Sequence, residues 1–500
     1  MIERYKLLMD FIKSEIVEDL KFENVVSEYW VAEPFIKIVI FEDVEHHKLR
    51  YFAIEPSLNV NELKILASII VDLRRILTLL DVSLELEDRA KALVKNFERL
   101  TKEYGIEIDS DLYSRMLYYL FREFFGYSII EPLIVDPNVE DISCDGYEIP
   151  IFVYQKSYGY LETNIKIPKL ALDRLVMLLT QRSGKHISLA NPIVDSTLPD
   201  GSRLQATFGT EVTPRGSSFT IRKFATQPLT PLDLVRFGTI PIGIMAYLWL
   251  AIEHKLSVIV VGETASGKTT TLNSILMFVP PDAKIVSIED TREIRLYHDN
   301  WLAQVTRTGI GEQEIDMYDL LRAALRQRPD YIVVGEVRGK EAQTLFQAMS
   351  TGHASYSTFH AGDINQMVYR FESDPLNVPR SMLQFLDIVL VQNMYLRGAK
   401  RIRRTKEINE ILGIDPADKN LLVNQFARWD AKRDEHIEVS IPKKLEKIAT
   451  SRMDDVYEEL QRRRKYLEWM IKSGVKDYTE FTKLIHNYYR NPEIAFSRVL

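Results

Sequence analysis

The stretch GETASGKTT, from Gly262 to Thr270, has the residue types and the spacing that suit phosphate binding. It fits the pattern G-x-x-x-x-G-K-[S/T], follows the apolar run SVIVV and precedes a helical pattern. Glycines let backbone N–H groups close around a phosphate, and a helix N-terminus adds the positive end of its dipole. The Lys268 ammonium would reach the β- and γ-phosphates, and the Thr269 hydroxyl would bind Mg²⁺. The pattern therefore predicts a nucleotide site formed by Gly262, Thr264, Ala265, Ser266, Gly267, Lys268, Thr269 and Thr270.

Acidic residues follow two further apolar strand patterns. Glu336 ends the run YIVVGE, and ligands of open parallel sheets bind at the carboxyl ends of strands. We expect Glu336 to hold the Mg²⁺ through water or to polarise the attacking water. The run VSIEDTREI places Glu289, Asp290 and Glu293 beyond its apolar part. One of these three acids would be the general base that orients water, and the spacing leaves open which one.

The segment TGHASYSTFHA, from Thr351 to Ala361, contains two histidines, His353 and His360. Zinc needs three or four ligands, and no third ligand is near them in the sequence, so a metal pair is disfavoured. If the segment is a strand, the two rings lie roughly 23 Å apart at about 3.3 Å per residue. His360 is then expected on the same rim as Glu336, where it would sense the γ-phosphate. His353 is expected near the opposite end, where it would couple this strand to a neighbour.

Two groups of arginines allow more than one interpretation. Arg203 and Arg222 fall on two strands predicted before a proline-rich segment, either as surface residues or as charges delivered onto a γ-phosphate. The run RGAKRIRRTK, residues 397–406, has six cations in ten residues. Nucleic acid, acidic lipid and an acidic protein partner all suit such a run. The acidic total charge favours a subunit interface or a solvated strand edge.

The composition limits the class of protein. The 500 residues are 46% hydrophobic and 27% charged, which predicts two or three domains with large cores rather than disorder. The net charge of −7 argues against nucleic-acid binding through bulk electrostatics. The single cysteine, Cys144, excludes an intrachain disulfide and a cysteine-based zinc site. The N-terminal residues lack the apolar core of a signal peptide, and no uncharged apolar run reaches 18 residues, so we expect a soluble chain.

Pattern changes along the chain predict an α/β fold in which a P-loop domain follows an α+β domain with a helical N-terminal region. Residues 1–20 suit an amphipathic helix, and residues 30–56 suit a hairpin. Prolines cluster between the two differently patterned halves, which suggests a hinge. The expected division is an N-terminal domain at 1–225, with helices at about 61–126 and a small sheet at about 127–225, a linker at 226–241, and an ATPase-type domain with a strand and helix extension at 242–500.

The ordered set of phosphate loop, IEDTRE, LRQRPDYIVVGEVR and TGH…STFHA resembles the type II/type IV secretion ATPase superfamily. The stretches DPNVEDISCDG and LPDGSRLQATF resemble its N-terminal domain, so the likeness covers most residues from about 110 to 400. The resemblance implies a RecA-like fold and a homo-hexamer that uses ATP and Mg²⁺. Such a hexamer works at the cytoplasmic face of a membrane, where it drives secretion or the assembly of pilin-like filaments.

The resemblance also implies roles for single residues. Glu293 would be the base of the family's aspartate box, Glu336 would take the Walker B role beside Thr269 at the metal, and the two histidines would form the histidine box. Arg203 and Arg222 match arginines that reach the nucleotide from the N-terminal domain. Residues expected just behind the reacting groups are Glu289, Asp290, Arg338 and His353.

Departures from the bacterial pattern point to the archaeal branch. The chain has no C-x-x-C pairs, Thr291 stands where bacterial members often have proline, and Gly339 stands where they often have aspartate. The closest likeness is to the archaellum (archaeal flagellum) motor ATPase. It implies a polytopic membrane platform protein and other archaellum cytoplasmic components as partners, and no nucleic acid. The alternatives are an archaeal type IV pilus or type II secretion ATPase, a nucleic-acid translocase, and a scaffold that binds ATP without hydrolysing it.

Overall fold

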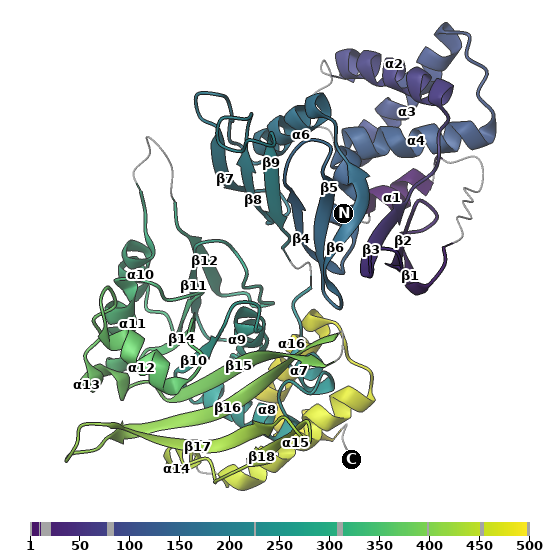
Figure 1. Ribbon diagram of the computed structural model, residues 1–500. Helices are drawn as coiled ribbons and strands as arrows, with labels where there is room; N and C mark the ends of the chain where they lie inside the picture. The colour runs from purple at the N-terminus through teal and green to yellow at the C-terminus, as the bar shows by residue number, and fades with distance from the viewer. Residues whose placement is uncertain are drawn as a thin grey trace. The chain divides into compact units, whose positions relative to one another are not determined.

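A computed structural model describes residues 3–9, 11, 22–77, 85–224, 227–307, 314–397, 400–450 and 455–497. The chain divides into two compact units, residues 1–224 and 225–500, each with its own sheet and its own buried core (Figure 1). Within the described ranges, no helix combines the length and the apolar character that crossing a bilayer would require.

The first unit is built on a nine-stranded mixed sheet, with the order β1-β2-β3-β6-β5-β4-β9-β8-β7. Only the β3–β6 pair is parallel. The hairpin expected at 30–56 is present as β2 and β3, with β1 paired to β2 on one side and β6 paired to β3 on the other. The strands are β1 Val25–Ala32, β2 Ile36–Asp43, β3 Lys48–Ile54, β4 Val139–Cys144, β5 Pro150–Gln155, β6 Gly159–Lys166, β7 Ile193–Thr197, β8 Arg203–Thr207 and β9 Ser218–Arg222.

Three long helices occupy the region where the sequence has helical periodicity. Each buries one apolar face, and the carboxylate of Asp109 caps α4 by accepting a hydrogen bond from the Leu112 N–H. The amphipathic pattern of residues 1–20 forms a helix at Glu3–Met9, and most of the remainder lies outside the described residues. The helices are α1 Glu3–Met9, α2 Val60–Leu77, α3 Leu86–Glu103, α4 Ser110–Phe124, the 3₁₀ turn η1 Ser128–Ile130, α5 Glu131–Val135 and α6 Lys169–Arg182.

The second unit contains the parallel sheet that the strand and helix alternation predicts. Its order is β12-β11-β13-β14-β10-β15-β16-β17-β18; the strands from β12 to β15 are parallel, and the last three pairs are antiparallel. Figure 1 shows the long strands β15 to β17 extending this sheet. The strands are β10 Val258–Gly262, β11 Ile285–Glu289, β12 Trp301–Val305, β13 Tyr331–Val334, β14 Ala354–Phe359, β15 Ile388–Arg397, β16 Lys400–Ile414, β17 Leu421–Asp430 and β18 Glu435–Glu438.

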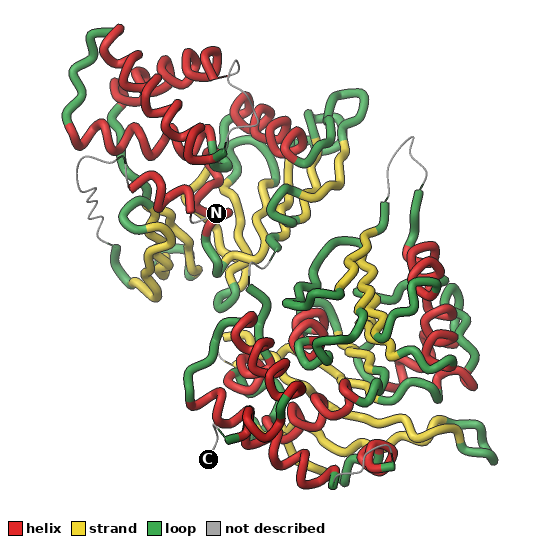
Figure 2. The backbone as a smooth tube through the Cα atoms, turned by 180° about the vertical axis from the view of Figure 1, so that it is seen from behind, coloured by secondary structure: helices red, strands yellow, loops and turns green. Residues whose placement is uncertain are grey.

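Both faces of this sheet are covered. Val260 of β10 belongs to one buried cluster and Val261 to another, because successive strand residues point to opposite faces. Helices lie on both sides of the strands (Figure 2), which confirms the predicted α/β class. The helices are α7 Pro231–Arg236, α8 Ile242–Glu253, α9 Lys268–Leu276, α10 Met317–Leu325, α11 Glu341–Ser350, α12 Ile364–Glu372, α13 Arg380–Leu383, α14 Lys444–Ala449, α15 Val456–Lys472, α16 Tyr478–Arg490 and α17 Pro492–Phe496.

The segment expected as a linker, 226–241, contains the short helix α7. Thr230 and Asp233 form a capping box at its start, and Leu232 and Leu234 are buried in the core of the second unit. The Leu229 carbonyl accepts a hydrogen bond of 2.6 Å from the hydroxyl of Ser274 on α9. This part of the segment is therefore packed onto the helix that follows the phosphate loop.

Candidate functional site

The phosphate-loop sequence forms the connection between the end of β10 and the start of α9. Gly267 has φ of 93° and Ala265 has φ of 62°, so the loop turns through the left-handed region twice. A Cβ atom on Gly262 would lie 2.5 Å from the Gln392 carbonyl oxygen and 2.5 Å from the Ser266 hydroxyl oxygen. The loop conformation therefore requires glycine at 262 and favours it at 267.

The side chains of the loop suit a phosphate ligand with Mg²⁺. Lys268 opens α9, and its ammonium donates a 2.9 Å hydrogen bond to the Glu263 carbonyl within the same loop. Thr269 and Thr270 follow in the first turn of the helix, where backbone N–H groups lack helical acceptors. An ammonium, a hydroxyl oxygen and the backbone donors of a helix N-terminus match the needs of a metal-bound polyphosphate. Thr264 and Ala265, in the middle of the loop, are exposed.

Two of the predicted acids, Glu336 and Asp290, contact the same arginine at the rim formed by the carboxyl ends of the parallel strands. Glu336 lies two residues beyond β13, and its carboxylate accepts a 2.6 Å hydrogen bond from Arg338 Nη2. The other amino group of Arg338 is 4.0 Å from Asp290 Oδ2. Asp290 also accepts a 3.2 Å hydrogen bond from the Thr306 hydroxyl. The guanidinium therefore lies between the carboxylate after β13 and the one after β11.

The structure separates the three acids of the IEDTRE segment by burial. Asp290 and Glu293 are exposed, whereas Glu289 is 2% exposed. Glu289 Oε1 accepts hydrogen bonds from the N–H groups of Glu293, at 2.7 Å, and of Ile294, at 2.8 Å. Burial raises the pKa of the Glu289 carboxyl to about 7, although the two N–H donors oppose this shift. Glu289 thus shapes the turn that carries Glu293.

The two histidines lie at opposite ends of β14, as the strand interpretation predicts. His360 follows the strand, and its Nε2 atom is 3.1 Å from the Thr264 hydroxyl oxygen in the phosphate loop. The His360 carbonyl accepts a hydrogen bond from Arg370 of α12. His353 precedes the strand, and its Nδ1 atom is 3.1 Å from the hydroxyl oxygen of Thr351. Only His360 belongs to the rim that the phosphate loop occupies.

Arg203 and Arg222 belong to the first unit. They are directly opposite each other on β8 and β9, and both side chains are exposed. Arg203 donates a 2.7 Å hydrogen bond to Asp195 Oδ2 on β7. The two arginines are therefore cross-strand neighbours on two inner strands of the first sheet, in an exposed basic spot that also contains the Asp195 carboxylate.

Residues that the motifs do not include also contact the phosphate loop. Arg403 of β16 donates an Nε–H hydrogen bond of 2.9 Å to the Ala265 carbonyl. Its neighbour Arg404 is buried and pairs with Asp434 at 2.8 Å. The basic run is evident in the sequence, but nothing in it distinguishes the arginine that reaches the loop from those that form ion pairs.

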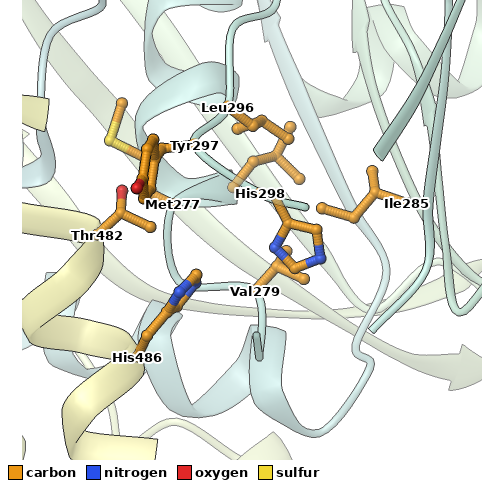
Figure 3. Close-up of a pocket in the computed structure, with 9 residues that line it drawn as sticks. Met277, Val279, Ile285, Leu296, Tyr297, His298, Thr482 and His486 are labelled. Carbon is orange, nitrogen blue, oxygen red and sulfur yellow. The ribbon is translucent and has the colours of Figure 1, made fainter. Parts of the chain in front are cut away.

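A small cavity lies at the other end of α9, away from the phosphate loop (Figure 3). The rings of His298 and His486 meet edge to face at its wall, with centroids 5.9 Å apart. His298 Nε2 is 2.6 Å from the Ala283 carbonyl oxygen, and His486 Nε2 is buried without a hydrogen-bond partner among the described residues. Desolvation, with a repulsive contribution from His298, lowers the pKa of His486 to about 4. The other residues that line the cavity are Leu276, Met277, Val279, Ile285, Leu296, Tyr297 and Thr482.

Comparison of the sequence with known proteins gives matches over both units. A family model described as "Type II/IV secretion system protein" matches residues 166–473. An uncharacterized protein of Methanocaldococcus jannaschii is 37% identical over 97% of this chain and 93% of its own length. A probable conjugal transfer protein TrbB of Sinorhizobium fredii is 32% identical over 56% of this chain and 84% of its own length.

Two solved structures align with most of the chain. The pilus retraction motor PilT, crystallised with bound ADP, is 21% identical over 67% of this chain and 90% of its own, with a TM-score of 0.42. The ATPase DotB of Legionella pneumophila is 19% identical over 70% of this chain and 92% of its own, with a TM-score of 0.41. The family model, which matches residues 166–473, covers the phosphate loop and most of the residues singled out from the sequence. These include Asp290, Glu336, His353, His360, Arg203 and Arg222.

Proposed function

Because the chain belongs to the type II/IV secretion system protein family, we propose that it is an ATPase that couples Mg-ATP hydrolysis to mechanical work. One observation carries this proposal: the phosphate loop, Glu336 and His360 converge at the carboxyl edge of one parallel sheet. Binding of a nucleoside triphosphate needs the loop alone. A water-polarising acid and a polar sensor on the same rim are the additional groups that hydrolysis needs.

Each residue of the rim has a part in the proposed reaction. The N–H groups of the loop and the Lys268 ammonium bind the β- and γ-phosphates, and Thr269 and Glu336 are the residues that would hold Mg²⁺. When bound, Mg²⁺ neutralises charge on the phosphate oxygens. Glu293 accepts the proton of the attacking water, while Glu289 keeps the backbone of that turn in place. His360 senses the γ-phosphate through its contact with the loop.

The proposed motor is a homo-hexamer in which Arg203 and Arg222 of the first unit supply charge to the nucleotide. We place it in the cytoplasm at the inner face of the cell membrane, bound through partners rather than through a membrane-spanning helix. The filament that it assembles is the archaellum, together with its platform protein and other cytoplasmic components. The archaeal features of the sequence, and its likeness to an uncharacterized archaeal protein along nearly the whole chain, support the archaeal branch to which this choice belongs.

A second candidate function is DNA or protein transfer by a secretion system. The 32% identity to a probable conjugal transfer protein favours it, although that match covers only 56% of this chain. An archaeal type IV pilus or a type II secretion system is the corresponding filament-based alternative. These machines share the chemistry of the rim and differ in what the hexamer moves.

The function is tested in the source organism with the gene replaced by a Lys268→Ala variant. Cells are imaged by electron microscopy and scored separately for archaella and for pili, and their motility is recorded. Loss of archaella with normal pili supports the archaellum assignment. Loss of pili alone, or of secretion with both filaments intact, contradicts it and selects an alternative. A Lys472→Ala variant, exposed in the last turn of α15, is the control and should leave both filaments unchanged.

A further inference from the structure

Arg403 contacts the phosphate loop from a strand more than a hundred residues away in the sequence. Its Nε–H donates to the Ala265 carbonyl at 2.9 Å, and its Cδ atom lies 3.2 Å from where a Cβ on Gly267 would be. The side chain is half-buried, and no carboxylate forms an ion pair with it in the part of the chain that the structure describes. Arg404, the next residue, is by contrast neutralised by Asp434.

The position of this contact on the loop is informative. Backbone N–H groups of a phosphate loop turn toward the ligand, so its carbonyls turn outward. Arg403 binds an outward carbonyl, and the residue that it binds, Ala265, has a left-handed backbone that disfavours a side chain. The guanidinium therefore stabilises Ala265, whose side chain makes the left-handed backbone conformation unfavourable by itself. It also leaves a positive charge without an acidic partner beside an expected polyphosphate.

The two residues that follow Arg403 on β16 are held by hydrogen bonds to the segment after α7. Arg404 Nη1 donates a 2.9 Å hydrogen bond to the Phe237 carbonyl. The Thr405 N–H donates a 3.0 Å hydrogen bond to the Thr239 carbonyl. Three successive residues of β16 thus connect the phosphate loop with the segment that follows α7. A guanidinium anchored in this way has a defined position relative to the loop before any ligand binds.

We propose that Arg403 is a positioning residue for nucleotide binding. It holds Ala265 in the left-handed conformation that directs the loop N–H groups inward, and its charge strengthens the attraction for the phosphates of a nucleoside di- or triphosphate. This inference rests on the proposed function, because it requires the loop to bind nucleotide. Arg403 does not take part in proton transfer, so it acts on affinity rather than on the chemical step.

The test uses the full-length chain with Arg403→Gln, Arg403→Lys and, as a control, Arg428→Gln. Arg428 is an exposed arginine on β17 of the same sheet, so its substitution removes the same charge away from the loop. The dissociation constant of Mg-ADP is measured by calorimetry, kcat and KM by phosphate release, and the unfolding midpoint without nucleotide by circular dichroism. Arg403→Gln should raise the dissociation constant and KM roughly tenfold, with kcat within about threefold of wild type. Arg403→Lys should recover part of this loss, and Arg428→Gln should lose none.

Two results would overturn the inference. Arg403→Gln that binds Mg-ADP as tightly as wild type shows that the contact does not position the loop. If Arg403→Gln has a lower unfolding midpoint without nucleotide, and its kcat falls as much as its affinity, then Arg403 only stabilises the fold. Failure of the proposed function gives a different result, since the wild-type chain itself would then bind no Mg-ADP or would release no phosphate from ATP.

Discussion

The His360 Nε2 atom lies 3.1 Å from the Thr264 hydroxyl oxygen, so the residue that follows β14 contacts the loop that follows β10. The contact follows from the sheet order, because β14 and β10 are parallel neighbours with Phe359 opposite Val261. Seven residues earlier, His353 lies at the far end of the same strand. The two histidines are thus in separate environments, and the rim of the sheet contains only one of them.

The first prediction compares these two histidines. His360→Ala should lower kcat by about ten- to a hundredfold, because it removes the polar group that contacts the loop at the phosphate site. His353→Ala, which loses only a contact with Thr351, should change kcat by less than about threefold. Steady-state phosphate release measures both. The opposite order of effects would contradict the placement of His360 as the sensor.

The second prediction concerns Glu289, whose pKa is raised to about 7 by burial. The folded state then binds a proton that the unfolded state, with an ordinary carboxyl pKa, releases as the pH rises above about 4.5. The stability that this group contributes is therefore fully present below about pH 4.5 and is lost as the pH rises to about 7, the pKa of the folded state. Glu289→Gln keeps the acceptor for the Glu293 N–H and cannot ionise. Between pH 5 and pH 8, wild type should lose about 2 kcal/mol of unfolding free energy relative to this variant.

Urea unfolding at the two pH values, followed by tryptophan fluorescence, measures that difference. An equal dependence on pH in wild type and in Glu289→Gln would show that the carboxyl titrates normally. The variant should also keep most of its turnover at pH 7, because the turn that carries Glu293 retains its hydrogen bonds.

The third prediction concerns the basic spot of the first unit. If Arg203 and Arg222 supply charge to the γ-phosphate, the double substitution to glutamine should lower kcat by about a hundredfold or more and leave ATP binding nearly unchanged. Arg215→Gln, which removes an exposed arginine from the same unit, is the matched control. Turnover of the double variant at the level of this control would show that the two arginines are only surface residues.

The fourth prediction concerns His486, whose pKa is lowered to about 4. The unfolded state binds a proton below about pH 6.5 that the folded state excludes, so stability falls as the pH is lowered from 6.5 toward 4. The ring is only partly buried, so solvent screening limits the loss to about 1 kcal/mol at pH 5 relative to pH 7.5. His486→Gln should abolish this loss in thermal unfolding. A loss of the same size in the variant would assign it to another group.

Local sequence patterns predicted the parallel sheet, the phosphate loop and the separation of the two histidines, because strand periodicity and loop chemistry depend on neighbouring residues. Burial of Glu289 could not be predicted, since it depends on Gly335 of the adjacent strand segment, where a Cβ would come within 3.1 Å of the Glu289 side chain. The Arg403 contact depends on the β10–β15 pairing, which places two distant stretches together, and on the β15–β16 hairpin that follows it. The short helix α7 was not predicted, because the prolines around it indicated a linker.

The most direct measurement of the central claim is phosphate release from ATP by the purified full-length chain in the presence of Mg²⁺. We predict turnover for wild type and for the Lys472→Ala control, and none for Lys268→Ala. Glu336→Gln should bind ATP with an affinity close to that of wild type and hydrolyse it at least about a hundredfold more slowly. Undiminished turnover in Lys268→Ala would contradict the assignment of the site, and nucleotide binding without turnover in the assembled wild-type protein would contradict the motor.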